Sequence, residues 1–286
     1  MSNARLPEEL LDDIVDLLHD SGDTLKSCCL VSKLWIPRAR KYLFATIKFT
    51  PEDLQLWKTT FPDPSTSPAC YTKALLLKFP LTVAAADREG RGWISTFNRV
   101  VHFEVDALDV DLNWSSFTLS LAPLYGFSPA IKSLRLSFYT VPSWQIFNLI
   151  YSFPLLDDLA VTSTSALVGN SDFNDRTTTI QPLISPSFTG SLELRLGFQM
   201  EYVASRLLSR SGGFHFRKLR STLREERDTS QITALVKECR FTLESLEVVS
   251  KLNSTFICHR RPQRSLISVC RPHANGVNRP LESHTA

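Results

Sequence analysis

Short segments that alternate apolar and polar residues recur through most of this chain, and this recurrence constrains its fold more than any other feature. Several segments share the form Leu-x-x-Leu-x-Leu with some Ile or Val replacements. Alternation with a period of two is typical of β-strands that are buried on one face. We therefore predict strands at Ala74 to Phe79, Val100 to Val105, Ile131 to Leu136, Leu156 to Val161, Ser191 to Leu196, Phe216 to Leu219 and Leu243 to Val248.

The central leucines of these segments follow one another at intervals of 25, 33, 27 and 27 residues: Leu134, Leu159, Leu192, Leu219 and Leu246. Helix-like stretches lie between them, at Ser143 to Phe153, Met200 to Ser209 and Thr229 to Cys239. A strand followed by a helix at this period is typical of leucine-rich-repeat solenoids, in which each unit packs only on its neighbours. Residues 71–250 resemble degenerate leucine-rich repeats, because the spacing is irregular and the expected Asn after the last Leu is missing. An unrelated α/β domain with alternating strands and helices is the alternative interpretation.

A solenoid of this kind leaves one face of its parallel strands uncovered, and that face suits the binding of a protein partner. Alternate strand positions would point outward and are candidate contacts for such a partner. They are Lys132, Ser133, Arg135, Asp158, Ala160, Glu193, Arg195, Ser245 and Glu247.

The first fifty residues have a different pattern of apolar residues, which predicts three short helices. From Leu6 to Leu18, apolar residues recur at three- and four-residue spacing after a proline, and acidic residues occupy the first turns. Acidic residues there are favoured by the helix macrodipole. Further helices are predicted at about Thr24 to Val31 and Ser32 to Phe44. About forty residues are too few for a well-buried core, so this unit is expected to need a partner.

These residues resemble an F-box, in the style of fungal F-box proteins. The resemblance rests on Leu-Pro-x-Glu-Leu-Leu-x-x-Ile at Leu6 to Ile14, then Leu25, the Cys29-Leu30-Val31-Ser32-Lys33-x-Trp35 segment, and Leu43-Phe44-x-x-Ile47. It implies that the helices bind a Skp-type adaptor, which joins F-box proteins to a cullin in a RING-type ubiquitin ligase. By position, the implied adaptor contacts are Leu6, Pro7, Leu10, Ile14, Leu30, Val31 and Trp35. A helical subdomain packed on the rest of the chain is the alternative interpretation.

The expected fold class is therefore α/β, with an N-terminal three-helix F-box followed by an irregular leucine-rich-repeat-like solenoid. The expected boundaries are residues 1–49 for the F-box, 50–70 for a linker, 71–250 for the repeats and 251–286 for a disordered tail. The linker is rich in proline, serine and threonine. The tail carries six Lys/Arg and one acidic residue, a net charge of +5. Because the whole chain has a net charge of +3, residues 1–250 have a net charge of −2.

Composition and motifs narrow the function. The body has no basic stripe, so we expect no nucleic-acid partner. The sequence contains no run of about 18 to 20 apolar residues, so no membrane span is predicted, and no signal peptide is expected. Both expectations favour a location in the cytoplasm or the nucleus. The six cysteines are expected to be reduced. We find no catalytic motif, cofactor loop or zinc-finger spacing, and expect no catalytic residue, cofactor or metal.

The sequence thus predicts a substrate-recognition subunit of an SCF-type cullin–RING E3 ubiquitin ligase that presents a protein target of unknown identity. The alternative is a non-catalytic F-box and leucine-rich-repeat scaffold that mediates protein–protein interaction without ubiquitination. An enzyme with its active site in residues 71–250 is a third, weaker possibility.

Overall fold

A computed structural model describes residues 7–78, 93–107, 121, 124–138, 143–163, 188–195, 200–208, 215–223, 227–250 and 255–259. Its main element is a single nine-stranded β-sheet. The strands are β1 (Thr46–Phe49), β2 (Ala74–Leu77), β3 (His102–Ala107), β4 (Ser133–Phe138), β5 (Asp158–Ser163), β6 (Ser191–Arg195), β7 (Lys218–Leu223), β8 (Ser245–Ser250) and β9 (Thr255–His259).

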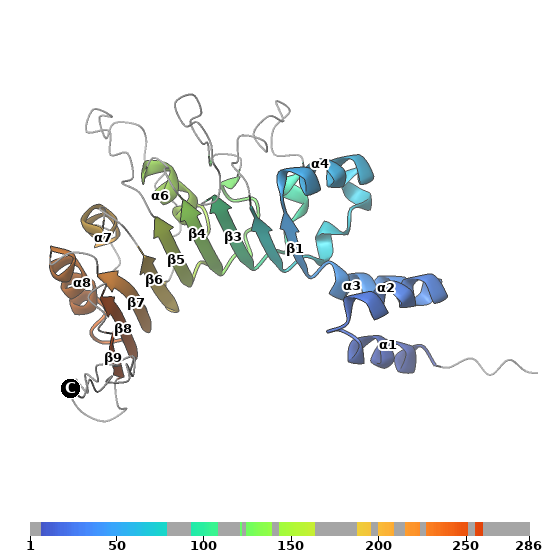
Figure 1. Cartoon of the computed structure of the whole chain (residues 1–286). Helices are drawn as coiled ribbons and strands as arrows, with labels where there is room; N and C mark the ends of the chain where they lie inside the picture. Colours follow the sequence, from blue (N-terminus) through green and yellow to red (C-terminus); the bar gives the residue numbers. More distant parts are fainter. Residues whose placement is uncertain are drawn as a thin grey trace, which may run out of the picture.

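The strands lie side by side in the order in which they occur along the chain. Strands β1 to β8 are all parallel, and β9 closes the series by pairing antiparallel with β8. The sheet curves as it proceeds, with helices on the outer side of the curve, and none of the described helices lies over the opposite face of the strands (Figure 1). The fold class is therefore α/β, as the sequence predicts, with a parallel eight-stranded sheet in which β2 to β8 correspond to the seven predicted strands.

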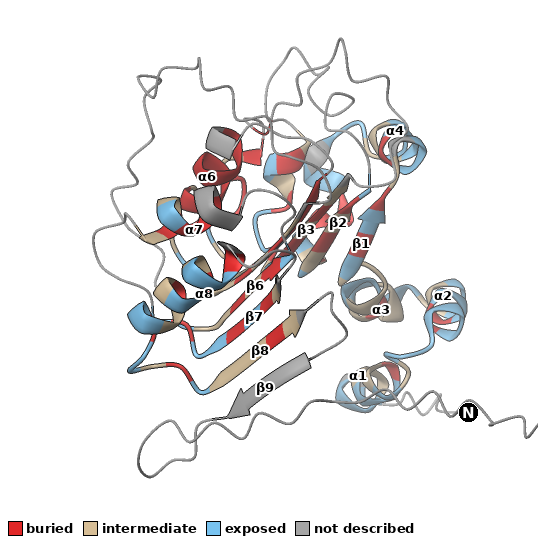
Figure 2. Ribbon diagram, turned by 60° about the vertical axis from the view of Figure 1, so that its left-hand side comes forward, coloured by how far each residue is buried: buried red, intermediate tan, exposed pale blue. Residues whose placement is uncertain are grey.

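The helices fall into two groups. Before the sheet come α1 (Glu8–Leu17), α2 (Gly22–Val31), the 3-10 helix η1 (Lys33–Trp35) and α3 (Ile36–Leu43). The connections between strands contain α4 (Pro51–Thr60), η2 (Pro64–Thr66), η3 (Pro68–Tyr71), η4 (Ile94–Thr96), α6 (Ser143–Tyr151), α7 (Met200–Leu208) and α8 (Arg227–Glu238). Helices α6, α7 and α8 lie against the same face of the sheet, where the buried residues gather (Figure 2).

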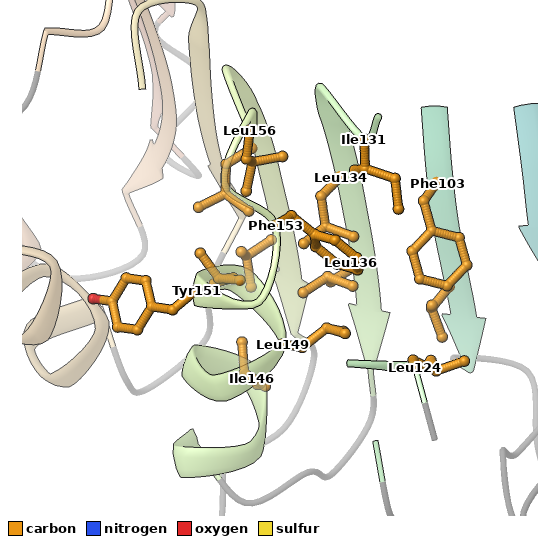
Figure 3. Packing of buried hydrophobic residues seen from close by; sticks show 14 of the residues in the cluster. Phe103, Leu124, Ile131, Leu134, Leu136, Ile146, Leu149, Tyr151, Phe153 and Leu156 are labelled. Atoms are coloured by element: carbon orange, nitrogen blue, oxygen red, sulfur yellow. The ribbon is translucent and has the colours of Figure 1, made fainter. Parts of the chain in front are cut away.

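The core consists of rows of apolar residues that run across the strands. The register aligns Leu75, Phe103, Leu134, Leu159, Leu192 and Leu219 in one such row, and all six are buried. Side chains of α6, among them Ile146 and Leu149, point at this layer from the helical side (Figure 3). The period of two therefore places the same apolar positions of each unit in one continuous core.

A recurring hydrogen-bond pattern marks the start of almost every strand. Two consecutive backbone N–H groups donate to one carbonyl at the entrance of the preceding strand, at 2.7–3.3 Å. The accepting carbonyls are those of Ala45, Lys73, Val101, Lys132, Gly190 and Arg217. The same local geometry therefore recurs at the entrances of β2, β3, β4, β5, β7 and β8.

The entrance of β6 departs from this pattern. There the Ser191 N–H donates to Asp158 Oδ1 at 2.6 Å, and the Ser191 hydroxyl lies 2.7 Å from the same oxygen. Gly190 permits this approach, since a Cβ at that position would overlap the Asp158 carboxylate and lie 3.2 Å from the Asp157 carbonyl. The side chain of Asp158 thus sets the register where a long connection enters the sheet.

The structure corrects several predicted boundaries. Most strands begin about two residues later than predicted, because the first apolar residue of each motif, such as Ile131 or Leu156, is buried in the preceding turn. Strand β1 was not predicted and lies at the end of the expected F-box segment, residues 1–49.

The segments expected to be a linker and a disordered tail also contain regular structure. In the expected linker, α4 and η3 place Leu54 and Ala69 in the sheet core. In the expected tail, Thr255–His259 form β9. The sequence allowed a short helix around Glu52 to Thr60, and α4 confirms it, whereas the many turn-forming residues of the two segments hid η3 and β9.

Candidate protein-docking surface on the first three helices

The first three helices form a small unit with a core of its own. Val15 of α1, Leu25 of α2 and Ala39 of α3 are fully buried against one another. Leu18, Cys29, Trp35, Tyr42 and Leu43 pack around them and remain partly exposed. This core is much smaller than that of the sheet, as expected for so short a segment.

Helix α1 carries two apolar stripes, and only one of them faces this core. Leu11, Val15 and Leu18 lie on the inner side, whereas Leu10, Ile14 and Leu17 follow each other at helical spacing about 100° away and are exposed. A helix in contact with water normally shows one apolar stripe, which faces the core. The second stripe of α1 is therefore available for a partner.

Helix α2 and η1 expose further large apolar side chains. Leu30 is 89% exposed, Val31 73% and Leu34 67%, and Leu17 on α1 is 82% exposed. In the described residues, six of the nine exposed large apolar side chains belong to this unit, which holds only a small share of the chain. We name these six residues the apolar docking surface: Leu10, Ile14, Leu17, Leu30, Val31 and Leu34. A concentration of this kind is typical of a protein interaction site.

An ion-pair network fixes α1 against α3 and so holds the outer stripe in place. Arg38 Nε donates to Asp16 Oδ1 at 2.6 Å, Arg38 Nη2 pairs with Asp16 Oδ2, and Asp12 Oδ2 lies 3.6 Å from Arg38 Nη1. Hydrogen bonds from Arg38 and then Tyr42 lower the pKa of Asp16 to about 2. The same network raises the pKa of Arg38 and of Tyr42, chiefly through the hydrogen bond of each with Asp16.

The unit is joined closely to the sheet. Only Phe44 and Ala45 separate α3 from β1. The ring of Phe44 packs edge-on against that of Trp57 on α4, with the ring centroids 6.2 Å apart. The Ala45 carbonyl accepts hydrogen bonds from the Lys73 and Ala74 N–H groups at 2.8 and 2.9 Å. Helix α3 also contacts η3. The docking surface is thus attached to the first units of the sheet through packed residues.

Most of the residues that the sequence singled out as adaptor contacts are exposed on this unit. Leu10, Ile14, Leu30 and Val31 belong to the apolar docking surface, and Pro7 is exposed. Leu6 lies outside the described residues. Pro7 is the residue directly before the first helical position of α1.

Trp35 differs from the other predicted contacts. It is half-buried and packs on the Val15, Leu25 and Ala39 core. Its main contribution is therefore to hold the three helices together.

Sequence reasoning missed two members of the docking surface, Leu17 and Leu34. Leu17 could have been found, because it is three residues after Ile14 and seven after Leu10 on the same stripe. Leu34 had no such signal, because it lies in η1 between two helices and its exposure depends on the turn.

Sites for other chemistry are not evident in the described part of the chain. Its His, Cys, Asp and Glu side chains form no group of three or more suited to a metal ion. None of its helices combines the length and the apolar character that a bilayer crossing requires. Comparisons with protein-family models, with curated proteins and with solved structures find no match to this chain.

Proposed function

We propose that this protein is a substrate-recognition subunit of an SCF-type cullin–RING E3 ubiquitin ligase that acts in the cytoplasm or the nucleus. Its first three helices would dock on a Skp-type adaptor and, through it, on a cullin, and its sheet would hold a protein target. The observation that carries the proposal is the apolar docking surface, in a unit whose sequence resembles an F-box.

The burial pattern favours docking over the alternative of a helical subdomain that merely packs on the rest of the chain. Such a subdomain would cover its surplus apolar side chains, whereas Leu17 and Leu30 are among the most exposed residues of the unit. Fully burying one such side chain contributes about 1.5–3 kcal/mol. Several of them at the centre of an interface would therefore contribute a large share of its binding free energy.

The sheet supports the second half of the proposal. Parallel strands that follow one another in chain order, most of them entered through the same hydrogen-bond pattern, are what degenerate leucine-rich repeats would form. This arrangement leaves a curved strand face, opposite α6 to α8, that no described helix covers (Figure 1). Such a face suits a protein target better than a small molecule, because it is broad and open.

The docking half is tested by co-purifying the full chain with a Skp-type adaptor. We expect the double substitution Ile14→Asp and Leu17→Asp to weaken adaptor binding at least about a hundredfold, because two apolar contacts become charged. Both residues are exposed, so the melting temperature should change little. The matched control is Leu56→Asp, since Leu56 on α4 is exposed and apolar but lies outside the docking surface.

Unchanged adaptor binding by the double variant, or an equal loss with Leu56→Asp, would contradict the docking proposal. The ligase role is separated from a scaffold role by inhibiting cullins in cells. Proteins that co-purify with the chain should then accumulate; if their levels stay constant, the scaffold alternative is correct.

A further inference from the structure

The uncovered face of the sheet carries charged side chains, and its cationic side chains are more exposed to solvent than its acidic ones. On β4 to β7 its cationic residues are Arg135, Arg195, Lys218 and Arg220, and all four are exposed. The acidic residues on the same face of β5, β6 and β8 are Asp158, Glu193 and Glu247, and all three are half-buried. We name the four cations the cationic patch.

Each of these carboxylates is already engaged by the protein itself. Glu193 Oε1 lies 2.6 Å from Arg195 Nε and 3.7 Å from Arg220 Nη1, and Glu247 Oε2 lies 3.3 Å from Arg220 Nε. Asp158 accepts hydrogen bonds from Ser191 at the entrance of β6. The arginine side chains are 49% and 46% exposed against 19% and 31% for the two glutamates, so the guanidinium groups form the outer layer.

Two members of the patch retain their whole charge for a ligand. Neither Arg135 nor Lys218 forms an ion pair with another described residue. In the register row of Arg135 and Arg220, the residues between them are Ala160, which is small, and Glu193, whose side chain is only 19% exposed. An approaching partner therefore contacts mainly positive charge, although the numbers of cationic and acidic residues on this face are nearly equal.

The spacing of the patch indicates which anion it fits. Arg135 and Arg220 occupy the same register row three strands apart, which corresponds to about 14 Å. A single phosphate group cannot bridge charges this far apart, whereas carboxylates spaced along an extended segment can. Arginine also binds carboxylates through two parallel hydrogen bonds.

We propose that the cationic patch binds an acidic, carboxylate-rich segment of a protein partner lying across β4 to β7. This inference rests on the proposed function and deepens it by naming the chemistry of the target. The patch is bounded on one side by β3, where Glu104 and Asp106 occupy this face, and on the other by β8, where Glu247 does, so the exposed cations are confined to β4 to β7.

The test measures fluorescence anisotropy of a labelled peptide of about eight residues, alternating Glu and Ser, with the full chain at about 50 mM NaCl. We expect this peptide to bind and the same peptide with Lys in place of Glu not to bind. The double variant Arg135→Ser and Lys218→Ser should weaken binding about tenfold. The control Lys48→Ser should weaken it less than about twofold, because Lys48 is exposed in the same register row but on β1, outside the patch.

Absence of binding, equal weakening by the control, or binding only of a peptide with one phosphoserine and Gln in place of Glu would overturn the proposal. Melting temperatures of the variants, measured in parallel, show that each is folded. No adaptor is present in this assay, so its failure leaves the adaptor-docking proposal standing, and loss of adaptor binding leaves this one standing.

Discussion

Asp16 shows how a single residue links the small helical unit to pH. Its pKa is about 2 in the folded protein, against an ordinary value of 3.8, because Arg38 and Tyr42 bind its charged form. A lowered folded pKa contributes stability above the ordinary value, and this contribution is lost as the pH falls toward the folded value. The attachment of α1 should therefore weaken between about pH 4 and pH 2.

We predict that Asp16→Asn lowers the melting temperature at pH 6 and that its difference from the unsubstituted protein shrinks as the pH falls toward about 2. The measurement is a series of thermal melts of both proteins across this range. Other acids titrate in both proteins and cancel in the difference. A difference that stays constant with pH would show that Asp16 acts by packing and not by its charge.

Strand β9 is the element whose structure differs most from the expectation that the sequence gives. Residues 251–286 read as a basic tail, yet Thr255–His259 pair antiparallel with β8 from Ser245 to Val249. An unpaired edge strand is a site for association with other chains. Strand β9 therefore covers the edge of β8, the last parallel strand, and takes its place at the end of the sheet.

We predict that a chain ending at Ser250 self-associates and melts at a lower temperature, because the β8 edge becomes free. Light scattering after size-exclusion chromatography measures the association. A chain ending at His259, which keeps β9 and lacks only residues 260–286, is the matched control and should behave as the full chain does. Equal association of both truncated chains would assign the effect to residues 260–286.

At the scale of the whole molecule, the short junction between α3 and β1 sets the position of the docking surface relative to the strand face. If this position matters for ubiquitin transfer, a flexible insertion should uncouple the two halves. We predict that about six Gly/Ser residues between Leu43 and Phe44 leave adaptor binding intact and lower target ubiquitination several-fold. The same residues added after Ala286 are the control.

Ubiquitination in a reconstituted reaction is the measurement, with adaptor binding determined on the same samples. An unchanged rate would mean that the target and the ligase meet without a fixed geometry. A loss of adaptor binding would instead mean that the first three helices depend on the sheet for their fold.

Local sequence predicted many of the strands and helices, because buried residues recur every two positions along a strand and every three or four along a helix. The alternation at Leu134 and Leu136 predicts a strand wherever it lies in the chain, and the recurrence of such segments predicted successive units in order. The two apolar stripes of α1 are likewise visible in residues 10–18. Strands β1 and β9 were missed because four or five residues without a long apolar pattern become strands only when a neighbour offers an edge.

The sequence by itself therefore determined the α/β class, the succession of parallel units and the surplus of apolar residues in the first helices. Only the tertiary structure decided which of those residues stay exposed: Trp35 turns into the core, whereas Leu17 and Leu34 remain outside. It also decided that Glu193 and Glu247 lie beneath Arg195 and Arg220. The physical reason is that periodicity defines the face on which a residue lies, whereas burial and pairing depend on segments distant in the chain.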